Sequence, residues 1–338
     1  MSWGASVSQR FTSIEICAGA GGMALGLESA GFEHLTVFDN DKHAHATLLH
    51  NRPQWNPQLC DVKSLDCSRY QDIDLFAGGV PCPPFSIAGQ QKGANDERDL
   101  FPDALRLIKQ TQPKAVILEN VRGFSGARFT EYRKYLIREL GQLGFTTQWQ
   151  VLKASDYGVP QLRPRFILVA LQQEYVPFFV WPDVIPNPPT VADVIGDLMG
   201  TEGWPGIDRW LEKAQSIAPT LVGGSKKHGG ADLGPTRAKR QWAELGVDGK
   251  GIADAPPRSA DPIDKLPRLT IPMVSRLQGF PDDWAFQGGK TAQYRQIGNA
   301  LPPFVAQHVG IAVKRALQKV ELETPTNKQL ELAGMNVA

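Results

Sequence analysis

Short apolar runs alternate with amphipathic segments along the first half of the chain. This alternation predicts strands at 13–17, 35–39, 58–62, 73–77, 115–118, 146–152 and 166–171, and helices at 23–30, 41–51, 99–110 and 130–143. Strands that alternate with helices are typical of a mostly parallel sheet covered by helices on both faces. We therefore predict an α/β fold with a doubly wound sheet, whose ligands bind at the carboxyl ends of the strands.

The pattern changes after about residue 181, where prolines cluster, and glycine, proline and polar residues dominate to about residue 264. This texture predicts a smaller, loop-rich second domain over 186–284. Residues 1–185 and 285–325 would then form the main domain, with a last helix over about 303–320. A polar C-terminal tail is expected over 326–338.

The composition and net charge of the chain argue against some classes of protein. The chain has 338 residues and a formal net charge of +1, which argues against a histone-like binder but leaves room for a local basic groove. It contains no apolar run long enough to span a membrane, and its first residues lack an apolar signal core, so we expect a cytoplasmic protein. The 4 cysteines form no CxxC pair and no histidine stands at zinc-finger spacing, so no metal site is predicted.

A glycine-rich turn follows the first predicted strand. Gly19, Gly21 and Gly22 stand between this strand and a helix, where glycines let the backbone turn tightly and approach a ligand closely. The second strand ends at Asp39, whose carboxylate suits ribose hydroxyls, and the third ends at Asp61, which suits an adenine amino group. Together they favour a nucleoside-type cofactor over the alternative, a tight turn without a ligand.

A second group of residues carries candidate chemistry. Cys82 stands among prolines directly after a predicted strand, and a buried cysteine in a turn is the ordinary alternative. Glu119 ends another strand, and Arg163 and Arg165 occupy alternate positions of an extended segment. A thiol, a carboxyl group and two arginines at neighbouring strand ends can attack, protonate and hold an electron-poor ring.

These residues belong to motifs that appear in a fixed order. They are AGAGG at 18–22, GGVPCPPFS at 78–86, ENV at 119–121, QLRPR at 161–165, RLQGFPDDW at 276–284 and GNALPP at 298–303. In these motifs the chain resembles the DNA (cytosine-5)-methyltransferases of bacterial restriction–modification systems. The resemblance covers about residues 13–313, and implies a Rossmann-like domain that binds S-adenosyl-L-methionine (AdoMet) and a target-recognition domain.

The resemblance also implies residue roles. AdoMet would contact a set of residues around the glycine turn, namely Cys17, Gly19, Gly21, Gly22, Asp39, Asp61 and Asn299. The family flips its target cytosine out of the duplex. Cys82 would then add to C6 of the base, Glu119 would contact N3 and the exocyclic amine, and Arg163 and Arg165 would support the carbonyl and the thiolate. Ser86 and the residues at 87–101 match a loop that closes over DNA.

Three positions depart from the family pattern. Cys17 replaces a phenylalanine that packs on the adenine, Pro83 replaces a common glutamine, and Pro272-Met273 replaces an Arg-Glu pair. The first change concerns cofactor binding, whereas the last concerns local packing between the domains. None of the three removes a residue assigned to the chemistry.

The predicted recognition domain contains one basic, glycine-containing stretch, at 217–240. Its candidates for DNA contact are Thr220, Gly223, Gly224, Lys226, Lys227, Arg237, Lys239 and Arg240. A solvated charged surface is the alternative interpretation of this stretch.

The sequence thus predicts an enzyme that methylates carbon 5 of cytosine in a short, specific double-stranded DNA sequence. It would act as a monomer and protect DNA from a possible cognate endonuclease, without a stable complex between the two. A tRNA cytosine-5 methyltransferase on the same fold is the nearest alternative, but its CFT-type signature is absent from the recognition stretch. A catalytically silent DNA-binding subunit is another, although Cys82, Glu119 and Arg163 are all present.

Overall fold

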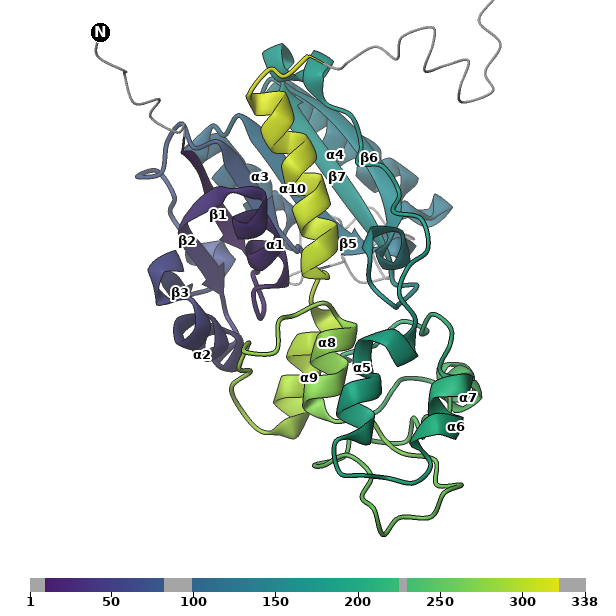
Figure 1. Cartoon of the computed structure of the whole chain (residues 1–338). Coiled ribbons are helices and arrows are strands. Elements are labelled where there is room, and N and C mark those ends of the chain that lie inside the picture. The colour runs from purple at the N-terminus through teal and green to yellow at the C-terminus, as the bar shows by residue number, and fades with distance from the viewer. Residues whose placement is uncertain (1–9, 82–98, 225–229, 322–338) are drawn as a thin grey trace, which may run out of the picture.

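The computed structural model describes residues 10–81, 99–224 and 230–321. Figure 1 shows two lobes, of which the upper one contains a sheet between helices. The strands are β1 (Phe11–Ile16), β2 (Phe32–Asp39), β3 (Pro57–Leu59), β4 (Leu75–Gly78), β5 (Ala115–Val121), β6 (Phe145–Lys153) and β7 (Pro164–Gln172). We call the upper part the sheet lobe and the lower part the helical lobe.

The seven strands lie in the order β3-β2-β1-β4-β5-β7-β6. The pairs from β3 to β5 are parallel, whereas β7 is antiparallel to both β5 and β6. The predicted α/β fold is therefore confirmed, although the last two strands make the sheet mixed. Only a short connection containing the 3₁₀ turn Ala154–Tyr157 joins β6 to β7, and parallel neighbours would need a longer crossover.

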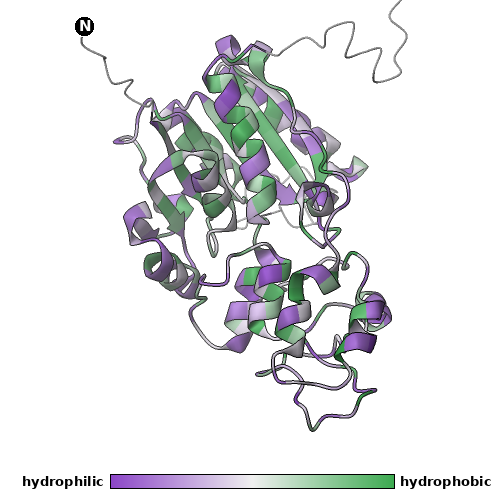
Figure 2. Ribbon diagram, in the orientation of Figure 1, coloured by the Kyte–Doolittle hydropathy of each residue, from purple (hydrophilic) through white to green (hydrophobic). Residues whose placement is uncertain are grey.

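Helices cover both faces of the sheet. Helices α1 (Gly22–Ala30) and α10 (Pro303–Leu317) pack on one face, and α3 (Phe101–Thr111) and α4 (Thr130–Gln142) on the other. Alternate side chains of a strand point to opposite faces of the sheet. In β4, Leu75 and Ala77 belong to the apolar cluster that includes α1 and α10, whereas Phe76 belongs to the cluster that includes α3 and α4. Strands β4 and β7 are accordingly mostly apolar and buried, and much of the sheet is green in Figure 2, as expected for a sheet buried on both sides.

The helical lobe consists of helices joined by long loops (Figure 1). Among its described residues the α-helices are α5 (Val191–Gly200), α6 (Ile207–Lys213), α7 (Thr236–Glu244), α8 (Ile271–Leu277) and α9 (Lys290–Asn299). Sequence periodicity predicted none of them, because each is short and is flanked by glycine or proline-rich loops. Local signals nevertheless mark some starts: Thr190 and Asp193 form a capping box at α5.

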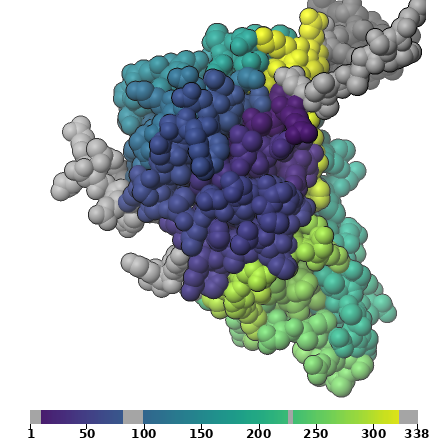
Figure 3. Space-filling model, turned by 90° about the vertical axis from the view of Figure 1, so that its left-hand side faces the viewer, coloured from purple at the N-terminus to yellow at the C-terminus, as the bar shows by residue number. Residues whose placement is uncertain are grey.

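The two lobes share one buried cluster. Leu48 and Trp55 of the sheet lobe belong to the same apolar cluster as Ile195 and Trp242 of the helical lobe. Trp55 also lies against Trp284, with ring centroids 5.8 Å apart. Helix α2 (Lys42–Asn51) and its neighbours meet the helical lobe directly in Figure 3. The helical lobe is therefore stabilised partly by side chains that the sheet lobe supplies.

Several element boundaries differ from the prediction by a few residues, and two of these differences have a local cause. Strand β3 ends at Leu59, so Asp61 does not end a strand as predicted, but caps the 3₁₀ turn Val62–Ser64 by accepting from the Lys63 amide. An aspartate readily accepts such a local hydrogen bond, which competes with strand formation. Helix α10 ends at Leu317 rather than near 320, because Lys319 adopts a left-handed conformation with φ 53°.

Candidate active site

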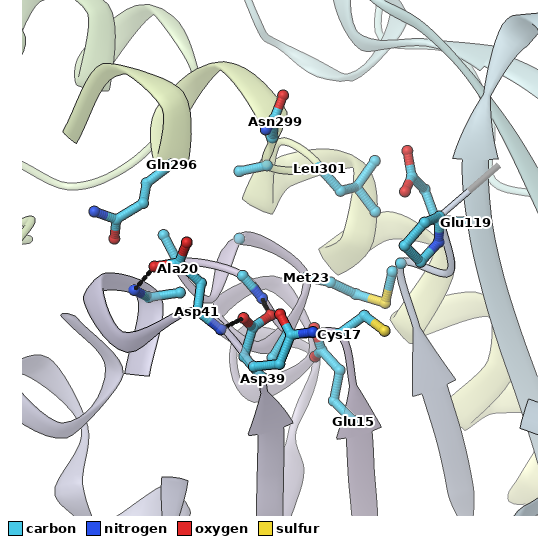
Figure 4. A pocket seen from close by; sticks show the side chains of 18 of the residues that line it. Glu15, Cys17, Ala20, Met23, Asp39, Asp41, Glu119, Gln296, Asn299 and Leu301 are labelled. Carbon is cyan, nitrogen blue, oxygen red and sulfur yellow. Dashed lines mark hydrogen bonds between the residues drawn. The ribbon is translucent and has the colours of Figure 1, made fainter. Parts of the chain in front are cut away.

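A pocket of about 280 Å³ opens at the carboxyl ends of the central strands. Its walls come from the glycine turn after β1, the end of β2, the segment after β4, Glu119 of β5 and the chain around α9. Figure 4 shows Glu15, Cys17 and Asp39 close together, with Glu119 on the far side and Asn299 above. A pocket at this edge is where a doubly wound sheet binds its ligand.

The three glycines of the turn have different surroundings. Gly19 has φ 55°, lines the pocket and has open space where a Cβ would stand. Gly21 is also left-handed, but a Cβ there would lie 2.8 Å from the side chain of Leu48. At Gly22 a Cβ would lie 2.2 Å from the Leu301 carbonyl oxygen. Gly19 therefore leaves room for a ligand, whereas Gly22 lets α1 approach the chain before α10.

Asp39 lies at the end of β2, as predicted, and organises the turn. One carboxylate oxygen accepts from the Gly19 amide at 2.7 Å and the other from the Asp41 amide at 2.7 Å. Each oxygen keeps further acceptor capacity, because a carboxylate oxygen can accept two hydrogen bonds. Asp39 lines the pocket and can therefore accept hydroxyl groups from a ligand.

Cys17 and Asp61 occupy different positions relative to this pocket. Cys17 lines it, with a left-handed backbone at φ 52°. Burial and the nearby carboxylate of Asp39 raise the pKa of its thiol, so Cys17 stays protonated and unreactive. Asp61 is exposed and is not among the lining residues, although the adjacent Val62 is.

The segment that leads to Cys82 is held from β5. Pro81 lines the pocket, and the side-chain amide of Asn120 donates to the Val80 carbonyl oxygen at 2.8 Å. Cys82 itself, like Ser86, lies outside the described residues. Sequence reasoning did not single out Asn120, although it stands in the ENV motif directly after Glu119. Its buried amide fixes the backbone two residues before the cysteine.

Glu119 and Arg165 form a buried ion pair at the edge of the pocket. Nε of Arg165 lies 3.0 Å from Oε1 of Glu119, and their side chains are 11% and 12% exposed. Burial raises the pKa of Glu119, while the two arginines oppose that rise. Glu119 can therefore donate a proton to a ring nitrogen, and Arg165 lies close enough to orient it.

The hydrogen bonds of Arg163 go to backbone carbonyl oxygens rather than to Glu119. Arg163 is fully buried, and its guanidinium donates to the carbonyl oxygens of Leu221, Gly298 and Ala300, each at 2.7 Å. Two backbone segments, one at Leu221 and one at Gly298 and Ala300, thus meet at this side chain. These contacts give Arg163 a positioning role between the lobes in this structure, and its predicted contact with the base or the thiolate stays a prediction.

Asn299 joins the pocket to the predicted recognition stretch. It lines the pocket, and its side-chain amide donates to the Gly224 carbonyl oxygen at 3.2 Å. The neighbouring backbones are in close contact, because a Cβ on Gly298 would lie 2.4 Å from the Gly223 nitrogen. A Cβ on Gly223 would in turn lie 2.6 Å from the Arg295 carbonyl oxygen, so Gly223 lets its segment pack against α9, a reason that sequence reasoning did not supply.

The other predicted DNA-contacting residues lie in the helical lobe. Arg237 and Arg240 are exposed on α7, where a spacing of three places them on neighbouring positions of the helix surface. Lys239 instead pairs with Asp232 at 2.9 Å. Thr220 directly precedes Leu221, which contacts Arg163. Lys226 and Lys227 lie outside the described residues.

Two further structural tests concern metals and membranes. Within residues 10–81, 99–224 and 230–321, no cluster of histidine, cysteine and acidic side chains could hold a metal ion. In the same ranges no helix is both long and apolar enough to cross a bilayer.

The chain matches the family model of C-5 cytosine-specific DNA methylases over residues 11–315. It is 52% identical over 313 residues to the Type II methyltransferase M.NaeI of Lentzea aerocolonigenes, covering 91% of this chain and 76% of that protein. It is 50% identical over 316 residues to the Type II methyltransferase M.NgoMIV of Neisseria gonorrhoeae, covering 92% and 99%.

Solved structures share the fold at lower identity. A putative DNA modification methyltransferase from an Escherichia coli prophage superimposes with TM-score 0.63 at 22% identity, over 91% of this chain and 99% of that one. DNMT2 of Spodoptera frugiperda gives TM-score 0.62 at 18% identity, over 91% and 99%. Family model, relatives and fold agree, and the chain belongs to the C-5 cytosine-specific DNA methylases.

Proposed function

We propose that this chain transfers a methyl group from AdoMet to carbon 5 of a cytosine flipped out of a short, specific double-stranded DNA sequence. The observation that carries the proposal is the buried Glu119–Arg165 pair beside the segment that leads to Cys82. Two relatives at about half identity are Type II methyltransferases, which supports a protective methylase with a cognate endonuclease. The monomeric state and the cytoplasmic location stay predictions.

The pocket residues fit AdoMet. Gly19 leaves open space beside the turn, Asp39 presents acceptors for the ribose hydroxyls, and Asn299 borders the opposite side. Asp61 is not among the residues that line the pocket, so it would contact the adenine from outside that set. When bound, AdoMet supplies an electrophilic methyl group on its sulfonium, and the residues of the chain hold that group toward the base.

The chemistry begins at Cys82. Its thiolate would add to C6 of the cytosine, while Glu119 donates a proton to N3 and accepts from the exocyclic amine. Protonation at N3 withdraws electrons from the ring and favours the addition. Arg165 would hold the base carbonyl while its ion pair keeps Glu119 in place. Electron density then develops at C5, which takes the methyl group, and loss of the C5 proton expels Cys82.

The first experiment expresses the chain in a host and sequences plasmid DNA after bisulfite treatment. We expect protected cytosines within one short motif. Soluble protein that binds AdoMet but protects no cytosine would contradict a DNA substrate and favour an RNA one or a silent binding subunit. The roles of Arg237 and Arg240 in DNA recognition are tested in the same assay by substituting each with glutamine. We expect each substitution to lower methylation of the motif or to allow methylation of related sequences.

The covalent step is tested with Cys82→Ala, which should abolish methyl transfer. DNA containing 5-fluorocytosine should trap the wild-type enzyme covalently, because the C5 fluorine cannot leave as a proton does. Cys60→Ala is the matched control, since Cys60 is a half-buried thiol outside the pocket lining. Unchanged turnover in Cys82→Ala would overturn the mechanism.

A further inference from the structure

Two buried side-chain amides that the mechanism above does not use lie in contact between the lobes. Gln161 stands shortly before β7, Gln278 directly follows α8, and both side chains are fully buried. Nε2 of Gln161 donates to Oε1 of Gln278 at 2.9 Å. A buried amide is costly unless its donor and its acceptor are both satisfied. The remaining contacts of this amide pair therefore show what it holds.

Gln161 holds the backbone of Leu221. The Leu221 amide donates to Oε1 of Gln161 at 2.8 Å, and the guanidinium of Arg163 donates to the Leu221 carbonyl oxygen at 2.7 Å. Gln161 and Arg163 occupy alternate positions of one extended segment, so their side chains bind the two backbone groups of Leu221 as a neighbouring strand would. The backbones themselves meet three residues earlier, where the Ala218 amide donates to the Pro160 carbonyl oxygen at 2.9 Å.

Gln278 extends this contact to the wall of the pocket. Its Nε2 donates to the carbonyl oxygen of Ala300 at 2.6 Å, and Ala300 lines the pocket. Because the Leu221 amide is a donor, the oxygen of Gln161 must face it and the nitrogen of Gln161 must face Gln278. The nitrogen of Gln278 then faces Ala300, which offers an acceptor. One backbone donor therefore fixes the orientation of both amides.

The residues directly after Leu221 are those expected to approach DNA. Val222 is 43% exposed although Leu221 is buried, and Gly223 and Gly224 were predicted to contact DNA. The apolar cluster shared by the lobes stabilises their contact without fixing a direction. Hydrogen bonds at Leu221 are directional, so they determine where the backbone leaves the core.

We propose that Gln161 and Gln278 are positioning residues for DNA recognition, which hold Leu221 in the place from which residues 222–224 face the DNA. The proposal rests on the proposed function. Without the amide pair this backbone would occupy several positions, and DNA would bind only the fraction of molecules in the correct one. The apparent dissociation constant of DNA would then rise by the inverse of that fraction.

The cofactor side of the pocket should depend less on the amide pair. Arg163 donates to the carbonyl oxygens of Gly298 and Ala300 at 2.7 Å, so this part of the wall keeps a donor when the amides are removed. Asn299, between these two residues, should stay in place at the pocket. Loss of the pair is therefore expected to affect DNA and AdoMet unequally.

The test is steady-state methyl transfer by the full chain from radiolabelled AdoMet to a plasmid that wild type methylates. In Gln161→Met a side chain of similar size loses its hydrogen bonds, and we expect the KM for plasmid DNA to rise about tenfold. The KM for AdoMet and kcat should each change less than about threefold, since loss of uniform binding raises KM alone. Gln172→Met is the matched control, because it removes a hydrogen bond to the Pro113 carbonyl oxygen at the other end of β7.

A double-substitution cycle tests whether the two amides act together. Gln278→Met should raise the KM for DNA about threefold, because the Leu277 carbonyl oxygen still accepts from Gln161. The double variant should match Gln161→Met, since residues in one hydrogen-bond network are not additive. Thermal melting checks that each variant folds, and Gln278→Met decides alone if Gln161→Met does not fold.

The outcomes separate this proposal from the proposed function. An unchanged KM for DNA in the amide variants, an equal rise of KM for both substrates, or the same rise in Gln172→Met would overturn the positioning role. Additive effects in the double variant would overturn the joint action of the pair. A wild type that binds AdoMet but methylates no plasmid would instead overturn the proposed function.

Discussion

The sheet lobe holds its site residues on hydrogen-bonded strands, whereas the helical lobe holds its loops through side chains that reach across from the sheet lobe. Asp39 and Glu119 lie on β2 and β5, whose neighbours fix them in register. Leu221 is instead held by Arg163, and by Gln161, which accepts from its amide at 2.8 Å. The strand ladder thus fixes the proposed cofactor side of the pocket, and a few buried polar side chains fix the segment proposed to contact DNA.

The largest effect on the free energy of unfolding is expected from substitution of Arg163. Arg163→Met removes the donor from the carbonyl oxygens of Leu221 and Gly298, whereas that of Ala300 keeps the side-chain amide of Gln278. We therefore expect a loss on the order of 4 kcal/mol in the free energy of unfolding. Urea unfolding followed by fluorescence checks this value. Arg138→Met, at an exposed arginine on α4, should change stability by less than about 0.5 kcal/mol.

The shape of the urea unfolding transition also tests whether the two lobes depend on each other for stability. If the lobes depend on each other through Arg163 and the shared cluster, the variant should unfold in one transition at lower urea. Two separate transitions in wild type would show that each lobe is stable alone, contrary to the comparison above.

A smaller effect is expected at the close contact between the lobes. In Gly298→Ala the new Cβ would lie 2.4 Å and 2.5 Å from backbone atoms of Gly223, so we expect a loss of about 1 to 3 kcal/mol. Gly141→Ala is the matched control, since it is also next to last in its helix and has open space. The control should be neutral or gain up to about 1 kcal/mol in thermal or urea unfolding.

Glu15 gives the sheet lobe a pH dependence. Because its folded pKa is raised, it stabilises the fold below the ordinary glutamate pKa, and this stabilisation is lost as pH rises through the folded value. Ligand-free Glu15→Gln should therefore match wild type in stability near pH 4 and be more stable than wild type near pH 8. Equal stability of the two proteins at both pH values, measured by urea unfolding, would refute this.

The smallest effect is expected on the surface of the helical lobe. Arg276 pairs with Asp197 at 2.6 Å and Asp282 at 2.7 Å, and both carboxylates are well exposed. Asp282→Asn should cost less than about 1 kcal/mol, and the cost should shrink in high salt. A large decrease in thermal stability that does not depend on salt concentration would mean that this ion pair contributes to the core of the helical lobe.

The sequence predicted the sheet lobe far better than the helical lobe. Strand periodicity located Asp39 and Glu119 at the ends of β2 and β5, because a buried sheet needs continuous apolar runs. Helices α5 to α9 escaped prediction, since their short segments depend on Trp55 and Leu48 from distant parts of the chain. Contacts between the lobes join residues that are far apart in the sequence, so local hydrophobic periodicity does not reveal them.

Within the site, residue chemistry was easier to predict than residue direction. Alternation placed Arg163 and Arg165 on one side of an extended segment, yet Arg165 meets Glu119 while Arg163 meets three carbonyl oxygens. The end of β3 was misplaced because Asp61 makes a local cap. Sequence reasoning assigned no role to Glu15, since the missing hydrogen-bond partner of its Oε2 becomes visible only once the strands are assembled.

The packing of α10 on α1 also orders events during synthesis. Gly26 and Gly310 allow these helices to touch, and Leu27 and Val309 share one apolar cluster. A nascent chain makes α1 early and α10 only after the helices of the helical lobe. That cluster therefore stays incomplete on the ribosome until α10 emerges, so a partly translated chain has no closed fold with which to bind its cofactor.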